Sequence, residues 1–189
     1  MSHNPPSAPD LAGRIFDYKA GTTALHQAAK EGTLQNLCGV TAELLATVKD
    51  NHGWTPLHEA AQYGHLDQIL GVTAELLATV KNNDDRTPLH LAAQYGYLAQ
   101  IPDLTITLAT TLGILNAALQ PHNISALTED FRRNGTHYNH SPTVNTALLK
   151  AANSIPRLSP PQRTAIKAAL GAAQEGGFVL PSDVLANLL

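Results

Sequence analysis

Apolar residues in the first half of the chain recur at i, i+3 and i+4 in three short segments that lie 32 residues apart. In the first segment they are Leu25, Ala28 and Ala29, and the pattern returns from Leu57 and from Leu89. This spacing places small apolar side chains on one face of a helix. A fixed period of this length is typical of stacked supersecondary units that share a continuous core. We therefore expect one short helix of this kind in each unit, packed closely against its neighbours.

The residues at both ends of these segments are those that start and end helices. The candidate N-caps are Thr23, Thr55 and Thr87, and the glycines that follow the segments are Gly32, Gly64 and Gly96. Pro56 and Pro88 occupy the first helical position, where a missing N–H costs nothing. A glycine ends a helix cheaply in the left-handed conformation. Two residues before the threonines come Gly21, Gly53 and Asp85. At this turn we expect a positive φ, which aspartate tolerates.

The second half of each unit has a different pattern. Gly39 to Lys49 recurs without change as Gly71 to Lys81. The glycine interrupts an expected second helix, and Thr41 or Thr73 then stands as a fresh N-cap. We predict short helices at 34–38 and 66–70 and separate helical turns at 42–47 and 74–79. Leu44, Leu45 and Val48 should pack into the core.

The third unit is looser, and no fourth copy follows it. Asp103 replaces the glycine, and 104–115 has no period that can be assigned. We expect a loop-rich stretch at 120–142 around a short helix at 126–133. Further helices are predicted at 143–153, at 162–175 after Ser159, and from Ser182 onward. This tail is either a cap over the open end of the repeat stack, as such stacks require, or a small helical module with its own partner.

The repeated phrase is Thr-Pro-Leu-His-x-Ala-Ala-x-x-Gly, found at 55–64 and 87–96 and, with Ala24 in place of proline, at 23–32. It resembles the ankyrin repeat over roughly 17–117. The resemblance implies an all-α, ankyrin-type α-solenoid of helix-turn-helix repeats with finger turns, here with a helical C-terminal extension. It also implies that His26, His58 and His90 hydrogen-bond to backbone at the junctions between units. The second halves lack the usual family ending, so the family geometry is carried over only to the first helix and the finger.

We therefore divide the chain into an N-terminal segment or cap at 1–16, three repeats over 17–117, and the extension at 118–189. The three repeats are expected at about 17–49, 50–81 and 82–117.

Composition argues against some classes of function but does not identify the function. The chain has 189 residues, 43% of them hydrophobic, and a net charge of −3. This charge argues against non-specific binding of nucleic acid, which needs a basic field. No apolar run approaches the roughly 20 residues that span a bilayer, and 1–9 lacks the pattern of a secretory signal. The lone Cys38 fits a reducing compartment and is expected to be a small buried hydrophobe. We expect a cytoplasmic monomer.

No constellation of residues indicates catalysis, a cofactor or a metal. The motif histidines recur once per unit and do not converge on a point. His137 and His140, with His122 upstream, have no cysteine or nearby carboxylate to complete a tetrahedral site. Phosphate-binding glycine loops and the common hydrolase motifs are missing from the sequence. We assign no catalytic residues.

The surface of the repeats is the best candidate for a binding site. The partner-binding candidates, all placed outward by register, are Trp54, Glu59, Gln62, Tyr63, Arg86, Leu91, Gln94 and Tyr95. Tyr63 and Tyr95 are equivalent and should stand about 10 Å apart, the width of a helix layer. Tyr, Trp and Arg carry most binding energy in interfaces. Alternatively, Trp54 is a partly packed finger residue, and the two tyrosines pack on each other.

These residues favour a non-catalytic protein–protein interaction module that binds a protein partner through its concave face and finger loops. Two other hypotheses remain open. The chain could be a bacterial effector that is delivered into a host cell and acts on a host protein. It could also be an enzyme, or an enzyme regulator, whose activity lies in 120–189.

Overall fold

The computed structural model describes residues 13, 15–17 and 20–186. The predicted N-terminal segment or cap, 1–16, lies almost wholly outside them. The chain divides into two compact units, Met1–Ile101 and Pro102–Leu189. This division falls inside the third predicted repeat. The first unit holds the repeated phrases, and the second is almost entirely helical.

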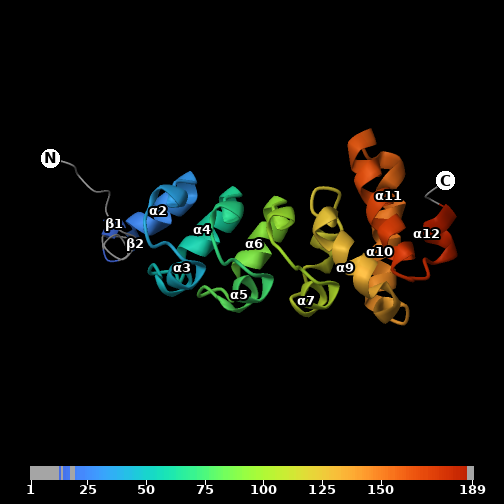
Figure 1. Cartoon of the computed structure of the whole chain (residues 1–189), viewed down its shortest axis with the longest axis horizontal. Helices are drawn as coiled ribbons and strands as arrows, with labels where there is room; N and C mark the ends of the chain where they lie inside the picture. The colour runs from blue at the N-terminus through green and yellow to red at the C-terminus, as the bar shows by residue number, and fades with distance from the viewer. Residues whose placement is uncertain (1–12, 14, 18–19, 187–189) are drawn as a thin grey trace. The chain divides into compact units, whose positions relative to one another are not determined.

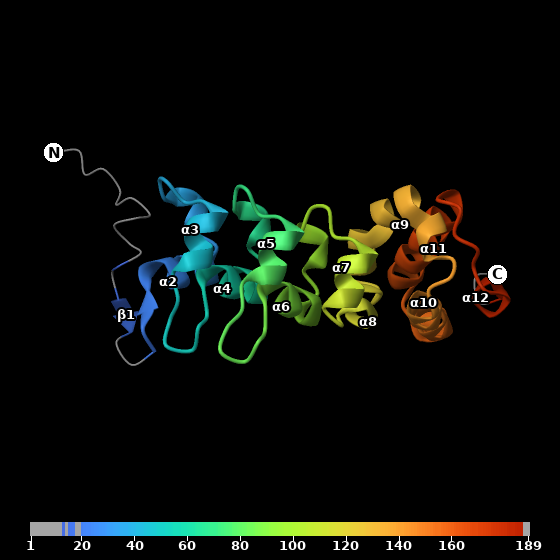
Figure 2. The same ribbon diagram turned by 90° about the horizontal axis from the view of Figure 1, so that it is seen from below.

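The first unit has an inner and an outer layer of short helices (Figures 1 and 2). The inner helices are α2 (Ala24–Glu31), α4 (Pro56–Tyr63) and α6 (Pro88–Tyr95), and the outer helices are α3 (Ala42–Thr47) and α5 (Ala74–Thr79). Short 3₁₀ turns follow the inner helices at η1 (Leu34–Asn36), η2 (Leu66–Gln68) and η3 (Leu98–Gln100). One antiparallel hairpin precedes them, in which β1 (Ile15–Asp17) pairs with β2 (Thr22–Thr23). The all-α solenoid predicted from the sequence is confirmed, with this hairpin as a small addition.

The inner helices begin and end where the motif predicts. Thr55 has extended backbone angles before α4, and Pro56 is its first residue. Gly64 then ends α4 with φ 79°. The apolar stripe is buried, since Leu57, Ala60 and Ala61 are all 0% exposed. Small side chains at these positions let adjacent inner helices approach closely.

The outer halves of the repeats correct one prediction and confirm another. The expected helices at 34–38 and 66–70 are only single 3₁₀ turns, because Leu37 and Ile69 are extended. Gly39 and Gly71 then take positive φ values of 76° and 79°. The helices at 42–47 and 74–79 have the predicted bounds.

Three side chains in this region are less buried than predicted. Leu45 is buried, but Leu44, on the side of the six-residue helix α3, and Val48, the extended residue that follows it, are partly exposed. Cys38 is exposed, which corrects its expected burial. It follows the extended Leu37, so no helix face turns it toward the core.

The finger turns are held by a side chain near their start. Asp50 Oδ1 accepts hydrogen bonds from the backbone N–H groups of His52 (2.9 Å) and Trp54 (2.8 Å). Asn82 Oδ1 does the same one period later, for Asp84 (3.0 Å) and Arg86 (2.9 Å). As predicted, Asp85 has a positive φ, 59°.

Neighbouring fingers are also hydrogen-bonded to each other. The Asn51 N–H donates to the Ala20 carbonyl, and the Asn83 N–H to that of His52, both at 3.0 Å. The fingers therefore form a ladder along one edge of the unit (Figure 2).

The second unit begins with α7 (Ile106–Thr111) and α8 (Leu115–Ala118). It continues with η4 (Ile124–Leu127), α9 (Thr128–Asn134), η5 (Gly135–Tyr138), α10 (Pro142–Ser154), η6 (Ile155–Arg157), α11 (Pro160–Glu175) and α12 (Ser182–Ala186). The helices predicted at 143–153 and 162–175 are confirmed. The stretch 120–142 is more helical than predicted, because two 3₁₀ turns flank α9.

A buried aromatic cluster and a buried carboxylate organise this unit. The Phe131 ring makes edge contacts with Tyr138 and Phe178, at centroid distances of 6.5 and 6.3 Å. Asp130, 7% exposed, accepts from the Ile106 N–H and from the Tyr138 hydroxyl, both at 2.8 Å. Asp130 therefore joins the start of α7 to α9 and η5.

Candidate functional site

A threonine–histidine network joins each inner helix of the first unit to the chain around it. The backbone N–H groups of Thr23 and Thr55 donate to Nδ1 of His26 and His58, each at 3.1 Å. The opposite ring nitrogens, Nε2, lie 3.0 Å from the carbonyl oxygens of Trp54 and Arg86 in the next finger. In the third phrase, the Thr87 N–H donates to His90 Nδ1 at 3.2 Å. The first two histidines thus tie their own helix to the following repeat.

The partners of these histidines fix their protonation state. A backbone N–H can only donate, so Nδ1 of His58 must be unprotonated, and a carbonyl can only accept, so Nε2 must carry the proton. A second proton on the ring would face the Thr55 N–H. Burial lowers the pKa of His58 to about 4, although the Arg86 carbonyl opposes this effect. Burial also lowers the pKa of His26. Both rings are neutral at pH 7.

Tyr63 and Tyr95, at the ends of α4 and α6, are the most accessible aromatic residues of the predicted binding surface. Their exposed fractions are 40% and 46%. Within the described part of the chain, no ring contact joins them. Instead, the Lys30 ammonium lies over the Tyr63 ring, 5.3 Å from its centroid. The residue equivalent to Lys30 one repeat later is Gln62, so the two tyrosines have different neighbours.

Trp54 and Arg86 occupy equivalent finger positions and are both partly exposed. The Trp54 ring lies 5.6 Å from the His58 ring, and its backbone N–H is held by Asp50. Arg86 donates from Nη2 to the Gln94 side chain. Each side chain therefore has a contact within the unit and still reaches the surface.

The remaining predicted site residues differ in accessibility. Gln94 is exposed, whereas Gln62 and Glu59 are partly buried. Burial raises the pKa of Glu59, and Lys30 partly opposes this shift. Leu91 is only 1% exposed, so its prediction as a contact residue is wrong. Leu91 is part of the core, whereas the equivalent residue of the preceding repeat, Glu59, is half-exposed.

Three residues that shape this surface are not among the predicted site residues. Lys30 covers the Tyr63 ring, and Asp50 and Asn82 hold the fingers. Asp50 and Asn82 stand five residues before the motif threonines. Asp and Asn side chains often accept from backbone two residues on, so this recurrence was a usable signal.

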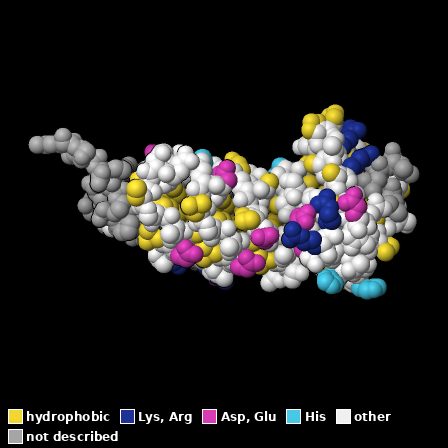
Figure 3. Space-filling model, viewed as in Figure 1, with side chains coloured by type: hydrophobic (Ala, Val, Ile, Leu, Met, Phe, Trp, Pro, Cys, Tyr) yellow, Lys and Arg dark blue, Asp and Glu magenta, His cyan; other side chains and the backbone are white. Residues whose placement is uncertain are grey.

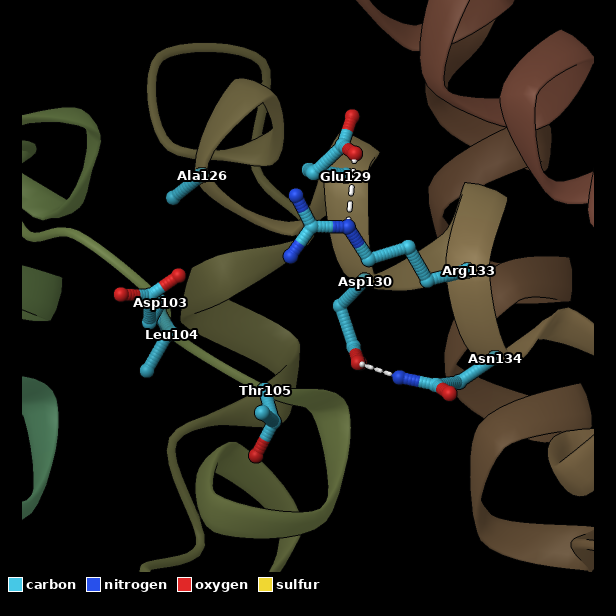
Figure 4. A pocket seen from close by; sticks show the side chains of 8 residues that line it. All are labelled: Asp103, Leu104, Thr105, Ala126, Glu129, Asp130, Arg133 and Asn134. Atoms are coloured by element: carbon cyan, nitrogen blue, oxygen red, sulfur yellow. Dashed lines mark hydrogen bonds and ion pairs between the residues drawn. The ribbon is translucent and has the colours of Figure 1, made fainter.

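The second unit has a polar pocket of about 130 Å³, lined by Asp103, Leu104, Thr105, Ala126, Glu129, Asp130, Arg133 and Asn134 (Figure 4). Its charged groups are largely engaged with each other. Arg133 Nε donates to Glu129 Oε1 at 2.8 Å, and Asn134 Nδ2 donates to Asp130 Oδ1 at 2.9 Å. The pocket wall is therefore a structural network around the start of α7.

Two other kinds of site have no candidate in the described residues. No group of three or more His, Cys, Asp or Glu side chains there could hold a metal ion. Among the same residues, no helix combines the length and the apolar character needed to cross a membrane.

The fold and the histidine network define a helical repeat protein whose units are joined through backbone carbonyls. Comparison with protein-family models gives the family. The model described as ankyrin repeats (3 copies) matches residues 9–70, and the model described as ankyrin repeat matches residues 84–104. The repeat region of this chain belongs to the ankyrin-repeat family. A search of curated proteins gives no match to the chain. Ankyrin repeats are generally protein–protein interaction modules, and the family is typically non-catalytic.

Proposed function

We propose that this chain is a non-catalytic module that binds a partner protein through the concave face and finger loops of its repeats. The observation that carries the proposal is the pair of exposed tyrosines, Tyr63 and Tyr95, at equivalent positions of two adjacent inner helices. A tyrosine combines a large apolar ring with a polar tip, and few of its torsions are lost on binding.

The scaffold beneath these side chains is fixed before any partner arrives. The fingers are held by Asp50 and Asn82 and are bonded to each other, and the inner helices are tied to them by His26 and His58. A surface that is ordered in advance loses less conformational entropy on binding. This supports recognition by the fingers and inner helices as one rigid surface.

The copies differ at exposed positions of this surface. Trp54 is replaced by Arg86, and His52 by Asp84, while Thr55, His58 and Gly64 are kept as Thr87, His90 and Gly96. The retained residues hold the fold, and the varied ones face outward from the fingers. Such a division suits a surface that is adapted to one partner. The proposed contact set joins the varied residues Trp54, Glu59 and Arg86 to two pairs that recur in both copies, Gln62 with Gln94 and Tyr63 with Tyr95.

The test begins with partners recovered by affinity purification and identified by mass spectrometry. Tyr63→Ala and Tyr95→Ala should each weaken binding by about tenfold or more, since aromatic residues at interface centres contribute about 2 kcal/mol. Trp54→Ala belongs to the same series. The matched control is Val179→Ser, because Val179 is 73% exposed and lies in the second unit.

Calorimetry of binding and circular dichroism of each variant decide the result. Unchanged affinity in folded tyrosine variants would move the site away from this face. Turnover of any substrate in a hydrolase screen of the whole chain would contradict the non-catalytic part of the proposal. Sedimentation and cell fractionation test the monomer and the cytoplasmic location that we infer with it.

A further inference from the structure

A second candidate surface lies on the first unit, where the 3₁₀ turns η1 and η2 adjoin. A pocket of about 200 Å³ opens there, lined by Leu34, Gln35, Leu37, Val40, Gln68 and Leu70. None of these residues belongs to the predicted binding surface around Tyr63 and Tyr95, which we call the tyrosine surface. We call this cavity the η pocket. Four of its six lining residues are apolar.

Leu70 makes the rim of the η pocket unusually apolar. It is 84% exposed, more than Tyr63 (40%) or Tyr95 (46%). It follows the extended Ile69 and precedes Gly71, whose φ is 79°. An exposed leucine alone needs no explanation, but one at the mouth of an apolar pocket forms a continuous apolar surface.

Gln68, at the junction between the first and second repeats, makes fewer hydrogen bonds across its junction than the equivalent residue at the next junction. At the following junction, the equivalent Gln100 donates from Nε2 to the Gly64 carbonyl (2.8 Å), and its Oε1 accepts from the Leu66 N–H (3.3 Å). Gln68 Oε1 is buried without a hydrogen-bond partner in the described structure. A buried acceptor left in this state destabilises the structure that holds it. A donor brought by a ligand would remove this cost.

Acidic residues lie close in sequence to the residues that line the pocket. Asp67 adjoins Gln68, and Glu43 and Glu75 lie in the first turns of α3 and α5. All three are exposed, and no ion pair involves them in the part of the chain that the structure describes. Figure 3 shows hydrophobic side chains on one face of the first unit with acidic side chains beside them.

The lysines that follow these helices are engaged elsewhere. Lys49 Nζ donates to the Lys81 carbonyl at 3.0 Å, and Lys81 Nζ pairs with Asp85 at 3.1 Å. Residues 1–101 contain ten acidic and six basic residues. The field around the η pocket therefore favours a cation.

We propose that the η pocket docks a segment of a partner protein that carries an apolar side chain flanked by Lys or Arg. The apolar side chain enters between Leu34, Leu37 and Val40 and packs on Leu70. The flanking cations face Asp67, Glu43 and Glu75. The Gln68 side chain turns its Oε1 toward the segment, and a backbone N–H of the segment supplies the donor that Oε1 lacks. This site is separate from the tyrosine surface, so the chain has two docking surfaces on one unit.

The experiment selects peptides from a random phage-displayed library on the full chain, with counter-selection on the Leu70→Ser variant. Leu70 is so exposed that its replacement leaves the core intact. We expect the selected peptides to share an apolar residue next to Lys or Arg. Their affinity, measured by fluorescence anisotropy, should fall by about tenfold or more in Leu70→Ser and about threefold in Glu43→Gln or Glu75→Gln.

Two controls separate the η pocket from the remaining surface of the chain. Val179→Ser removes a comparably exposed apolar side chain in the second unit and should leave peptide affinity unchanged. Tyr63→Ala and Tyr95→Ala should also leave it unchanged, so failure of the tyrosine surface and failure of the η pocket are distinguishable. Loss of binding in the tyrosine variants would overturn the η pocket as the site.

Other outcomes also overturn the proposal. These are the absence of any enriched peptide, enrichment of peptides without basic residues, and affinity that Leu70→Ser does not change. Sedimentation tests the competing occupant. A dimer of the full chain that is lost in Leu70→Ser would assign the η pocket to a second copy and not to a partner.

Discussion

The inner and outer halves of the repeats are held by different interactions. The inner halves are connected to one another by hydrogen bonds from buried histidines to backbone, such as that of His58 with the Arg86 carbonyl. The outer halves consist of a 3₁₀ turn, a glycine and a six-residue helix with an exposed threonine cap. The stability of the inner halves is therefore shared between neighbouring repeats. Many hydrogen bonds of the outer halves join residues within the same short segment.

The difference also appears in how the copies vary. The inner halves differ at finger residues, as between Trp54 and Arg86, but the outer stretch Gly39–Lys49 is identical to Gly71–Lys81. A few motif residues fix the inner helix, so its exposed positions are free to change. Changes in inner motif residues should therefore cost much more than changes in their outer counterparts.

The largest effect should come from His58→Ala. This change leaves the buried Thr55 N–H without a partner, removes one of the two donors to the Arg86 carbonyl, and opens a cavity. We expect a loss of about 4 kcal/mol in the free energy of unfolding. Urea denaturation followed by circular dichroism measures it. The control is His52→Ala, because the His52 side chain is exposed on a finger. A loss below about 1 kcal/mol for His58→Ala would show that the network matters little.

A pair of glycines with the same backbone angle gives the next comparison. Gly64 in the inner half and Gly71 in the outer half both have φ 79°. A Cβ on Gly64 would lie 2.6 Å from the Tyr97 ring, whereas a Cβ on Gly71 would meet nothing within 4 Å. We expect Gly71→Ala to cost about 1 kcal/mol from backbone strain alone, and Gly64→Ala about 3 kcal/mol with the added overlap.

Thermal and urea unfolding of both variants measure this difference. Truncation of the ring in a Gly64→Ala/Tyr97→Ala double variant should recover part of the loss relative to Tyr97→Ala alone. Equal costs for the two glycine variants would contradict the role given to the ring.

Stability should also depend on pH through His58. Its pKa is about 4 in the folded chain and has the ordinary value of 6.5 in the unfolded chain. The unfolded state therefore binds a proton first as pH falls, and stability is lost between pH 6.5 and 4. Between pH 6.5 and 5 this amounts to about 2 kcal/mol. Denaturation of the wild type and of His58→Ala across this range measures the difference. An equal pH dependence in the two proteins would contradict the assignment.

The smallest effect should come from the outer caps. The Thr41 and Thr73 hydroxyls accept from the Leu44 and Leu76 N–H groups at 3.2 Å. Replacing either threonine by alanine should cost about 1 kcal/mol. Because the two caps stand in identical segments, the two variants should have closely similar denaturation midpoints. A difference above about 1 kcal/mol would show that the outer segments are less independent than their local bonding indicates.

Much of the fold was predictable because its signals are local. Thr55, Pro56 and Gly64 mark both ends of α4, and Thr73 marks the start of α5. The prediction of a helix at 66–70 was wrong because the chain becomes extended at Ile69. That extended conformation depends on packing, which the pattern of residues does not report. The start of α7 was also missed, although Thr105 stands 32 residues after Thr73.

The candidate surface was less predictable than the fold. Register placed Tyr63 and Tyr95 outward, and they are exposed. The same register placed Leu91 outward, but it is buried, since burial depends on what lies opposite and not on helix phase alone. The cation over Tyr63 likewise comes from a residue 33 positions earlier, Lys30. Contacts of this range are set by the stacking of units.

The identity of the two outer segments has one more consequence. Any deletion of 32 consecutive residues that begins within Gly39–Lys49 yields the same shortened chain, because the residues on both sides of the cut are the same. In that chain His26 would face the Arg86 carbonyl, and Gly32 would face Tyr97. The junction between the second and third repeats already has both pairings, His58 with the Arg86 carbonyl and Gly64 with Tyr97. A single recombination event can thus change the number of repeats, and the repeats on either side of the deletion would meet through an interface of an existing type.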